Sequence, residues 1–240
     1  MQVNRFDIQE GIYQFETEHL DTALHAHPAV EILMAEEGSF SLQTPHTYNT
    51  QVRFAIIDSQ ALHQIKADHS RIKILLLESY NTLLPDLLKQ LGMLFTDGVY
   101  IATTTQMEVY QQLLDFGNEQ SLQITPDQRV NTCLQAFRNQ DLEYHQMIAS
   151  LQAVTFLSES RLSHLFKEYV GVSLKKYLVW TKLKKTIAYL LQAEANLTQS
   201  SLQAGFYDQA HFTRAFKKHL GITPSKAYNS RTLQFLFPSE

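Results

Sequence analysis

The sequence predicts an α+β protein of two domains, a small β-barrel or sandwich followed by an all-helical domain. Short extended segments separated by turn residues lie between residues 30 and 77, whereas nearly every pattern after Pro126 has helical spacing. The charge divides at the same place. The part before Pro126 has 6 Lys and Arg against 16 Asp and Glu, a net charge of −10, and the rest has 14 against 8, a net charge of +6. With 240 residues the chain is long enough for two domains, and the basic one is a candidate for binding phosphate backbones.

The first domain is placed at residues 1–80, and its centre is expected to consist of strands. The predicted strands are Val30–Met34, Phe40–Gln43, Val52–Ile57 and Ile72–Leu77. Turn-forming clusters separate them, namely Glu37-Gly38-Ser39 and Thr44-Pro45-His46. Several short strands at this spacing favour a small barrel or sandwich.

Residues 81–125 are predicted to contribute two helices, Leu83–Leu94 and Met107–Phe116, between the domains. The apolar residues of each helix fall on one face, and they are Leu84, Leu87, Leu88, Leu91 and Leu94 in the first and Met107, Tyr110, Leu113 and Leu114 in the second. These faces would serve either as a dimer surface or as part of an internal core, and both interpretations stay open.

Several classes of protein are excluded by composition. No apolar run approaches the ~20 residues of a membrane-spanning helix, so we expect no membrane partner. The N-terminus lacks the basic start and apolar stretch of a secretion signal, and the single cysteine, Cys133, forms no disulfide with another cysteine of the chain, which fits the cytoplasm. The sequence shows no nucleophilic triad, no glycine-rich phosphate loop and no cysteine cluster, and an enzyme is not expected.

The basic half contains an internal repeat at an offset of 50 positions. Its two copies are Ser158–Ser173 (SESRLSHLFKEYVGVS) and Asp208–Thr223 (DQAHFTRAFKKHLGIT). Each begins with a residue suited to cap a helix, runs for about three turns and stops at a glycine. The apolar positions have helical spacing and must face a core; they are Leu162, Leu165 and Phe166 in the first copy and Phe212, Ala215 and Phe216 in the second. A short helical stretch precedes each copy, Ile148–Phe156 and Leu197–Ala204, so the unit is helix, tight turn, helix.

The opposite face of each repeated helix is polar and predicts contact with base edges. The first helix carries Ser160, Arg161, Ser163 and His164, the second carries Gln209, His211, Thr213 and Arg214, and the matching lysines Lys167 and Lys217 complete the expected DNA-binding set. Arginine bridges O6 and N7 of guanine, glutamine pairs with adenine, and the threonine methyl group touches thymine. We expect Arg214 to contribute most to sequence reading.

A single helix is predicted from Ser173 to Leu191, about 28 Å long at 1.5 Å per residue. Such a rod would hold two reading helices roughly 34 Å apart, one turn of DNA. Five of its lysines are expected largely outside, where they either neutralise phosphates or form a solvated face: Lys175, Lys176, Lys182, Lys184 and Lys185.

The basic half resembles the DNA-binding domain of the AraC/XylS type of transcriptional regulator. The first half of that pattern is carried by Ser158, Leu162, Leu165-Phe166-Lys167, Gly171 and Tyr177, and the second by Gly205-Phe206, Asp208, His211-Phe212, Arg214, Phe216-Lys217-Lys218, Gly221 and Thr223-Pro224-Ser225. The resemblance implies two helix-turn-helix units joined by a long helix, each reading one major groove of double-stranded DNA. Two positions depart from the family pattern. Gln152 stands where a small residue is usual, and Ser200-Ser201 stands where the family usually has an apolar residue followed by a small one.

The acidic half carries two histidines and a glutamate at a spacing that suits metal ligation. His25 and His27 alternate onto one strand face, Glu31 follows, Gly38 comes seven residues later, and His63 is available from a later strand. This spacing resembles the first motif of the cupins, although His19 stands where that motif begins with glycine. The four residues are expected either to line the pocket of a small-molecule effector or, as the alternative, to bind metal in a metal-dependent cupin enzyme or a metal sensor.

Together these observations predict a cytoplasmic, sequence-specific regulator of transcription. A cupin-like sensor would occupy residues 1–80. Residues 81–125 would form a helical linker that also serves, in one of the two interpretations, to pair two chains. A double helix-turn-helix domain would occupy residues 126–240. The expected partners are double-stranded DNA and an effector of unknown identity, with a homodimer and contact with RNA polymerase as further partners. No cofactor is expected under this interpretation.

Overall fold

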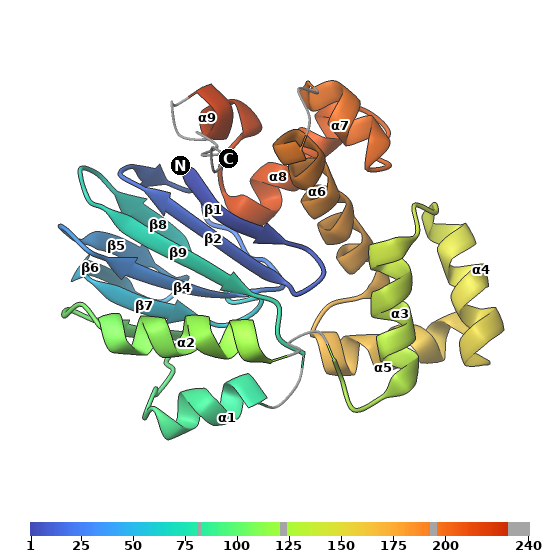
Figure 1. The fold of residues 1–240 in the computed structure, drawn as a ribbon, viewed down its shortest axis with the longest axis horizontal. Helices are drawn as coiled ribbons and strands as arrows, with labels where there is room; N and C mark the ends of the chain where they lie inside the picture. Colours follow the sequence, from blue (N-terminus) through green and yellow to red (C-terminus); the bar gives the residue numbers. More distant parts are fainter. Residues whose placement is uncertain (81–82, 121–123, 193–195, 230–240) are drawn as a thin grey trace, which may run out of the picture.

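The computed structural model describes residues 1–80, 83–120, 124–192 and 196–229 (Figure 1). Its strands lie almost entirely in the first hundred residues, and helices follow. Two β-sheets form one half of the molecule, and a cluster of helices with its own core forms the other. The predicted α+β, two-domain architecture is therefore confirmed. The final stretch of the predicted DNA-binding domain, residues 230–240, lies outside the described residues.

The barrel consists of a six-stranded and a four-stranded antiparallel sheet. The first has the order β1-β2-β9-β4-β7-β10 and the second the order β3-β8-β5-β6. The strands are β1 (Gln2–Asp7), β2 (Ile12–Thr17), β3 (Leu20–Asp21), β4 (Val30–Ala35), β5 (Phe40–Gln43), β6 (Tyr48–Val52), β7 (Phe54–Ile57), β8 (Gln64–Ala67), β9 (Ile72–Leu77) and β10 (Val99–Ala102). In β4 and β9 almost every residue is buried, because both faces of the large sheet are covered.

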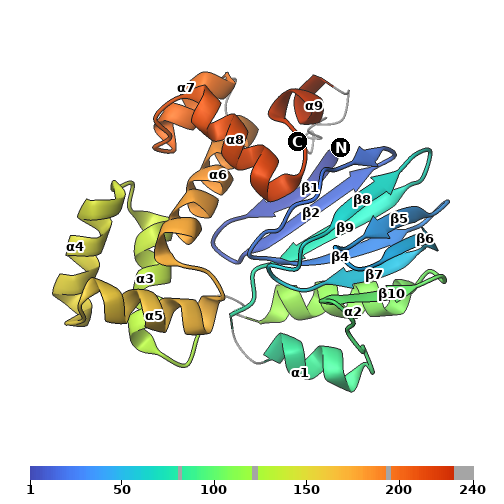
Figure 2. The same ribbon diagram turned by 180° about the vertical axis from the view of Figure 1, so that it is seen from behind.

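Side chains along the central strands point alternately to the two faces of the sheet, so they contribute to two separate cores. Leu33 and Ala55 point between the two sheets, and Ile32 and Ile56 point to the outer face of the six-stranded sheet. Helix α1 (Leu83–Gln90) and helix α2 (Met107–Glu119) lie against that outer face (Figures 1 and 2). Strand β10 lies between these two helices along the chain and pairs with β7, so the sheet extends beyond residue 80, the predicted end of the barrel.

Most of the apolar face of α1 and of α2 is buried by this internal contact. Leu84 and Leu88 of α1 and Tyr110 and Leu113 of α2 are buried against the sheet. The predicted face of the first helix is too long, because Leu94 lies beyond the end of α1 and is 84% exposed. A core face is therefore the main role of these two helices.

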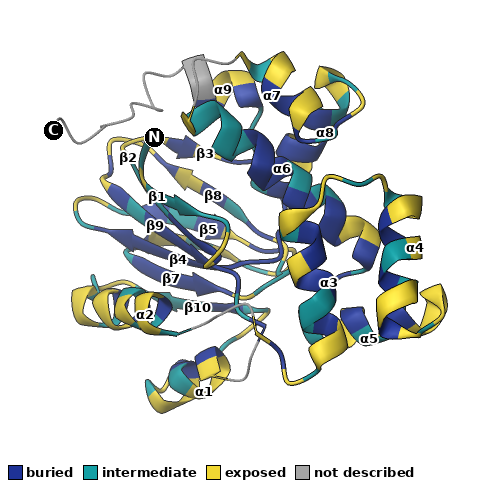
Figure 3. Ribbon diagram, turned by 45° about the vertical axis from the view of Figure 1, so that its right-hand side comes forward, coloured by how far each residue is buried: buried dark blue, intermediate teal, exposed yellow. Residues whose placement is uncertain are grey.

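The helical half consists of α3 (Gln128–Asn139), α4 (Tyr144–Thr155), α5 (Glu159–Val170), α6 (Leu174–Gln192), α7 (Leu197–Gln203), α8 (Gln209–Leu220) and α9 (Pro224–Asn229). They share one core with the aromatic residues Phe137, Phe166, Tyr177, Phe206 and Phe212. Figure 3 shows buried residues where the helices face one another and exposed residues on the outer sides of α5 and α7. None of the helices in the described part of the chain has the length and apolar character needed to cross a membrane.

The long helix α6 has fewer exposed lysines than the sequence suggests. Lys175 and Lys176 are exposed as predicted, but Lys184 and Lys185 are buried. The prediction was wrong for this pair because α6 is packed on both sides, by the other helices and by the barrel. The Lys182 ammonium group is also engaged: it lies 3.1 Å from Glu143 Oε1 and donates to Gly205 O at 2.6 Å.

The departure at Ser200-Ser201 leaves a visible defect in α7. Both residues are fully buried, and Ser201 Oγ donates to Thr198 O at 2.9 Å. The Ser200 hydroxyl is a buried oxygen with no hydrogen-bond partner among the described residues. A buried polar group without a partner is unfavourable, so α7 is less stable than an apolar residue here would make it.

Candidate DNA-binding surface and histidine site

The first candidate reading helix, α5, is fixed at both ends by local sequence. Ser158 caps it by accepting a hydrogen bond from the Arg161 amide at 3.4 Å, and Gly171 ends it in the left-handed conformation at φ 79°. Leu162 and Phe166 are fully buried, which turns the opposite face outward. Ser160, Arg161, His164 and Lys167 are exposed on that face, and Ser163 is half-buried.

The second candidate reading helix, α8, repeats this construction. Asp208 Oδ1 accepts from the His211 amide at 2.6 Å, and Gly221 ends the helix at φ 70°. Gln209, Arg214 and Lys217 are exposed, and His211 and Thr213 are half-buried. The two polar faces that the sequence predicts are thus both accessible, and together these ten side chains are called the reading surface.

On the reading surface the two arginines are free to contact DNA, whereas Gln209 and Thr213 already form hydrogen bonds within the protein. No hydrogen bond or ion pair holds the guanidinium group of Arg161 or Arg214 within the described part of the chain. Gln209 Oε1 accepts from Thr198 Oγ1 at 2.8 Å, and Thr213 Oγ1 donates to the Gln209 carbonyl at 2.8 Å. Gln209 must release one partner to read a base, whereas Arg214 need not.

Two exposed aromatic residues flank the reading helices and are absent from the predicted set. Phe156, in the turn before α5, is 90% exposed and has φ 57°, and Tyr207, in the turn before α8, is 88% exposed. Their only sequence signal is their place at the turn of each repeat. Aromatic rings at these positions add apolar area beside the polar reading surface.

The four predicted pocket residues His25, His27, Glu31 and His63 come together as one buried cluster, called here the histidine site. One ligand atom from each residue lies within 4.8 Å of those of the other three, and all four residues are buried. The pairing of His25 with His63 across an isolated β-bridge brings the later residue to the first three. Sequence spacing predicted the first three and named the fourth, but only the fold shows that they meet.

The rings are oriented as metal ligands commonly are. Nδ1 of each ring donates to a backbone carbonyl: His25 to Ala23 at 2.9 Å, His27 to Ala29 at 3.0 Å and His63 to Ala61 at 2.8 Å. Because a carbonyl only accepts, Nδ1 carries a proton, which leaves Nε2 as the nitrogen that a metal ion would take. Backbone partners of this kind fix the tautomer of a ligating histidine.

The potential ligand atoms of the histidine site lie close together at its centre. Glu31 Oε2 lies 3.1 Å from His27 Nε2 and 3.0 Å from His63 Nε2, and the latter has no hydrogen-bond partner among the described residues. Three imidazole nitrogens and one carboxylate suit zinc or another divalent transition metal. The residues present therefore fit the metal that a cupin-like fold implies.

The protonation of the site favours the same interpretation. Burial, together with the neighbouring rings of His63 and His27, lowers the pKa of His25 to about 3, so this ring is neutral at physiological pH. Burial alone would raise the pKa of Glu31, but the imidazoles of His27 and His63 outweigh it and lower that pKa, which keeps the carboxylate charged. A buried, charged carboxylate in this position attracts a cation.

The helical half lies beside β1 and β2 of the barrel (Figures 1 and 2), and two of its helices contact this site. The Trp180 ring of α6 stacks on the His27 ring, with centroids 6.1 Å apart and 18° between planes. At the end of α8, Gly221 O accepts from the Ala23 amide at 2.7 Å. A cavity of about 100 Å³ remains between the two halves, lined by His25, His27 and Glu31, by apolar residues of β2 and β9, and by side chains of α6 and α8.

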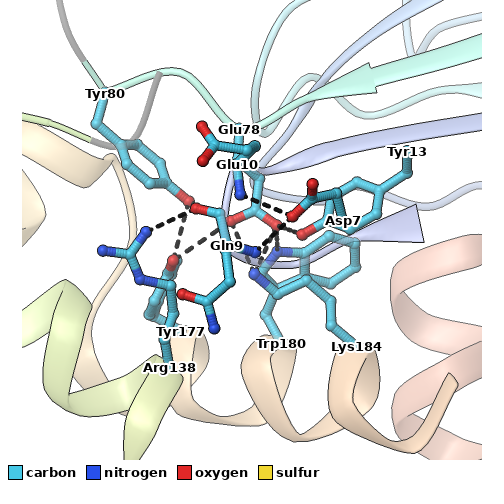
Figure 4. Close-up of polar contacts among 10 residues, drawn as sticks. All are labelled: Asp7, Gln9, Glu10, Tyr13, Glu78, Tyr80, Arg138, Tyr177, Trp180 and Lys184. Carbon is cyan, nitrogen blue, oxygen red and sulfur yellow. Dashed lines mark hydrogen bonds and ion pairs between the residues drawn. The ribbon is translucent and has the colours of Figure 1, made fainter. Parts of the chain in front are cut away.

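A second buried cluster joins the two halves, centred on the carboxylate of Glu78 (Figure 4). Lys184 Nζ lies 2.6 and 2.8 Å from its two oxygens, and four further donors reach them: Tyr13 at 2.7 Å, Tyr80 at 2.8 Å, Trp180 at 3.0 Å and Tyr177 at 3.3 Å. Burial would raise the pKa of Glu78, but the Lys184 ammonium and these donors lower it, so the carboxylate is ionised. Nearby, Arg138 Nη1 donates to Gln9 O at 2.9 Å.

Two helix-turn-helix units held on one long helix define a bipartite DNA-binding domain. Residues 151–230 match the family model described as a helix-turn-helix domain. The arabinose operon regulatory protein of Salmonella typhimurium is 32% identical over 107 residues, 45% of this chain and 38% of that protein, and an uncharacterised helix-turn-helix transcriptional regulator of Haemophilus influenzae is 27% identical over 126 residues, 52% and 41%. The chain thus spans about two fifths of the length of these relatives. The helical half therefore carries a helix-turn-helix domain similar to that of AraC-type regulators, as the sequence resemblance predicted.

The whole fold is similar to that of ToxT from Vibrio cholerae. A crystal structure of ToxT from strain O395 superposes with a TM-score of 0.53 over 90% of this chain and 95% of that one, at 11% identity. A structure of wild-type ToxT with a bound unsaturated fatty acid gives 0.53 over 90% of this chain and 93% of that one, also at 11% identity. At this identity the likeness concerns the fold alone, a β-sheet domain followed by a helical domain.

Proposed function

We propose that the chain is a sequence-specific DNA-binding regulator of transcription that responds to a small ligand held in its barrel. The observation that carries the proposal is the pair of equivalent reading helices, each with an unpaired, exposed arginine opposite a fully buried core face. Phosphate contacts would position the domain, and the base contacts would give it specificity. Both Lys175 and Lys176 lie exposed at the start of α6 and would serve as phosphate contacts.

The chemistry of α8 favours it as the stronger reader. Arg214 would bridge O6 and N7 of guanine, and Gln209 would pair with adenine after leaving Thr198. On α5, Arg161 has the same chemistry, whereas Ser160 and Ser163 are short and discriminate weakly between bases. Lys167 and Lys217, one on each helix, would neutralise phosphates beside the groove.

The cavity between the halves is the proposed effector site. The ligand-bound ToxT structure holds an unsaturated fatty acid, so a protein of this fold can accommodate a small molecule. Here the lining combines apolar side chains of β2, β9 and α6 with the polar histidine site. A ligand there touches both halves at once, so its binding would shift how they are held together.

A metal ion is the second candidate ligand, favoured by the arrangement of the histidine site. His25, His27, His63 and Glu31 would hold it, and it would neutralise the buried carboxylate. The arrangement argues against a metal-dependent cupin enzyme, because Trp180 of α6 stacks on His27 and the end of α8 contacts Ala23 beside His25, so that side chains of the helical half cover the ligands. We therefore propose binding rather than catalysis.

Further partners follow from the proposed function. A regulator that acts on chromosomal DNA works in the cytoplasm, where it meets RNA polymerase. A homodimer would use the parts of α1 and α2 that remain exposed, including Met107, which is 46% exposed. These assignments rest on the proposed role in transcription and stand or fall with it.

Selection of bound sequences from a pool of random DNA duplexes tests the proposal. We expect enrichment of two short half-sites roughly 10 base pairs apart, one for each reading helix. Affinity for the selected site should fall ~10³-fold or more between 50 and 200 mM salt, because several phosphate contacts are made. Failure to enrich any sequence, with binding that ignores salt, would contradict DNA recognition and favour a protein partner for the helical half.

A further inference from the structure

The residues that cover the histidine site belong to the helical half of the molecule. Trp180 comes from α6 and stacks on His27, whose Nε2 faces Glu31. A Cβ atom on Gly221, at the end of α8, would lie 2.6 Å from Ala23 O and 2.7 Å from His25 Nδ1. The backbone of the DNA-binding domain thus rests on the same carbonyl that orients His25. A change at the histidine site therefore reaches the DNA-binding domain through direct contact.

The Glu78 cluster holds this docked arrangement in place. Glu78 follows β9 of the barrel and Lys184 lies in α6, and both are buried to within 1%. The same carboxylate also accepts from Trp180 Nε1. Trp180 therefore contacts the histidine site through its ring face and the buried ion pair through its ring nitrogen, which links the two clusters within one side chain.

We propose that binding of a divalent transition-metal ion at the histidine site and docking of the DNA-binding domain onto the barrel are coupled, so that the metal acts as an effector that stabilises the docked arrangement. The inference deepens the second candidate ligand of the proposed function and depends on the histidine site binding metal. It assigns the link between the two halves to Trp180, Gly221 and the Glu78–Lys184 pair.

The chemistry of the ligands gives the coupling its direction. A metal ion at Nε2 draws electron density from the imidazole ring and strengthens the hydrogen bond that Nδ1 donates. For His25 this bond ends on Ala23 O, in contact with Gly221. For His27 the more positive ring faces the electron-rich surface of Trp180, an interaction of the cation–π kind. Both effects favour the docked arrangement.

Coupling of this kind is reciprocal, which makes it testable from the side of the barrel. If metal stabilises docking, then loss of docking must weaken metal binding by the same factor. Lys184→Met leaves Glu78 buried without its counter-ion in the docked arrangement, while a flexible apolar side chain of similar length is kept between the two halves. Glu78→Gln combined with Lys184→Met removes the stranded charge, so docking should return. Neither substitution touches a ligand of the histidine site.

The first measurement is the affinity of the full chain for Zn²⁺, by competition with a chelator. We expect wild type to bind one Zn²⁺ per chain, Lys184→Met to bind about tenfold more weakly, and the double variant to return to near the wild-type affinity. Removal of a ligand that lies away from the interface, by His63→Ala, should abolish binding in every background.

The second measurement uses Trp180, the single tryptophan of the chain, which is 2% exposed when docked. In Lys184→Met its emission should shift to the red as the domains separate, and Zn²⁺ should move it back to the blue. In the His63→Ala, Lys184→Met variant Zn²⁺ should have no effect. Zinc is used because it has no unpaired electrons that quench fluorescence.

Several outcomes would overturn the inference. Equal Zn²⁺ affinity in wild type and Lys184→Met contradicts the coupling, whether or not the emission of Trp180 shifts. A red-shifted emission that Zn²⁺ leaves unchanged contradicts it as well. Absence of Zn²⁺ binding to wild type overturns the histidine site as a metal site, and selection from the duplex pool separately decides whether the chain binds DNA.

Discussion

The two reading helices, α5 and α8, are built alike but are placed in different surroundings. Both have 12 residues, a polar N-cap, two buried apolar positions at the same spacing and a left-handed glycine at the end. Local sequence therefore produces the same element twice. The difference lies at the last residue: nothing comes within 4 Å of a Cβ placed on Gly171, whereas one on Gly221 would collide with Ala23 and His25 of the barrel.

This difference separates the roles of the two units. The first unit contacts the remainder of its own domain, and its helix end is open. The second unit is anchored to the barrel at the histidine site. A change in the barrel would therefore reach α8 by direct contact but not α5, and α8 also carries Arg214, the residue proposed to contribute most to base reading.

The largest effect should come from removing the equivalent core rings, by Phe166→Ala and Phe212→Ala. Both side chains are fully buried, and each is in contact with two other aromatic rings. Each change should lower the free energy of unfolding of the helical domain by about 3–5 kcal/mol. A markedly smaller loss for one of the two would show that the units are not equivalent in their cores.

Alkylation of Cys133 during denaturation by urea would follow this unfolding. The thiol is the single cysteine of the chain, it lies in the core of the helical domain, and burial raises its pKa to about 12. It should therefore react only when the domain opens. Rapid alkylation of the native protein at pH 8 would contradict the packing described for α3.

The next effect compares Gly171→Ala with Gly221→Ala. Both place a Cβ atom in a left-handed conformation, at a cost of about 1–2 kcal/mol. Gly221→Ala also forces the helix end away from Ala23 O, and overpacking of this kind adds about 1–3 kcal/mol. Thermal unfolding of the two variants measures the difference, and equal losses would mean that Gly221 does not touch the barrel in solution.

Arginine substitutions test the reading surface itself. Arg214→Ala should weaken binding to the selected DNA site by about 1–3 kcal/mol and relax the preference at one base position. Arg161→Ala should act on the other half-site. Lys217→Ala is the control, because loss of a phosphate contact should weaken binding to all sequences about equally. An unchanged preference in Arg214→Ala, determined by repeating the selection, would remove Arg214 from the base-reading role.

The smallest effect concerns the helix caps. Ser158→Ala and Asp208→Ala should each lower the free energy of unfolding by about 1 kcal/mol, because each removes the acceptor for an amide at the start of its helix. Asp208→Ala should be the larger of the two, since a carboxylate also interacts favourably with the helix dipole. Urea denaturation distinguishes them, with Ser158→Asp as the variant expected to gain stability.

Much of the helical half could be predicted because its signals are local. Caps, glycine stops and helical spacing specify α5 and α8 without reference to the rest of the chain, and the resemblance to a known family covers the same residues. Strands were harder: the sequence analysis missed β1, β2, β3, β6, β8 and β10. Several of these strands pair with partners that lie far away in the sequence, such as β2 with β9 and β8 with β5, so no local pattern reveals them.

The contacts between the halves could not be predicted from local patterns. Lys184 and Lys185 have the composition of a solvated helix face, and only the barrel packed against α6 buries Lys184. Glu78 lies 106 positions from Lys184, and no periodicity links them. The histidine site was predicted in part because His25, His27 and Glu31 are close in sequence, while its cover by Trp180 was not.

The side chain of Lys182 has a mechanical consequence for the DNA that the domain would accept. Its ammonium group reaches Glu143 at the start of the first unit and the Gly205 carbonyl in the turn of the second, so one residue braces both units against α6. We therefore expect the two units to turn together with α6 rather than separately. If the two half-sites of a target are moved apart by a single base pair, the second major groove no longer faces the second unit. The second unit would then have to rotate independently of the first, which the contacts of Lys182 oppose.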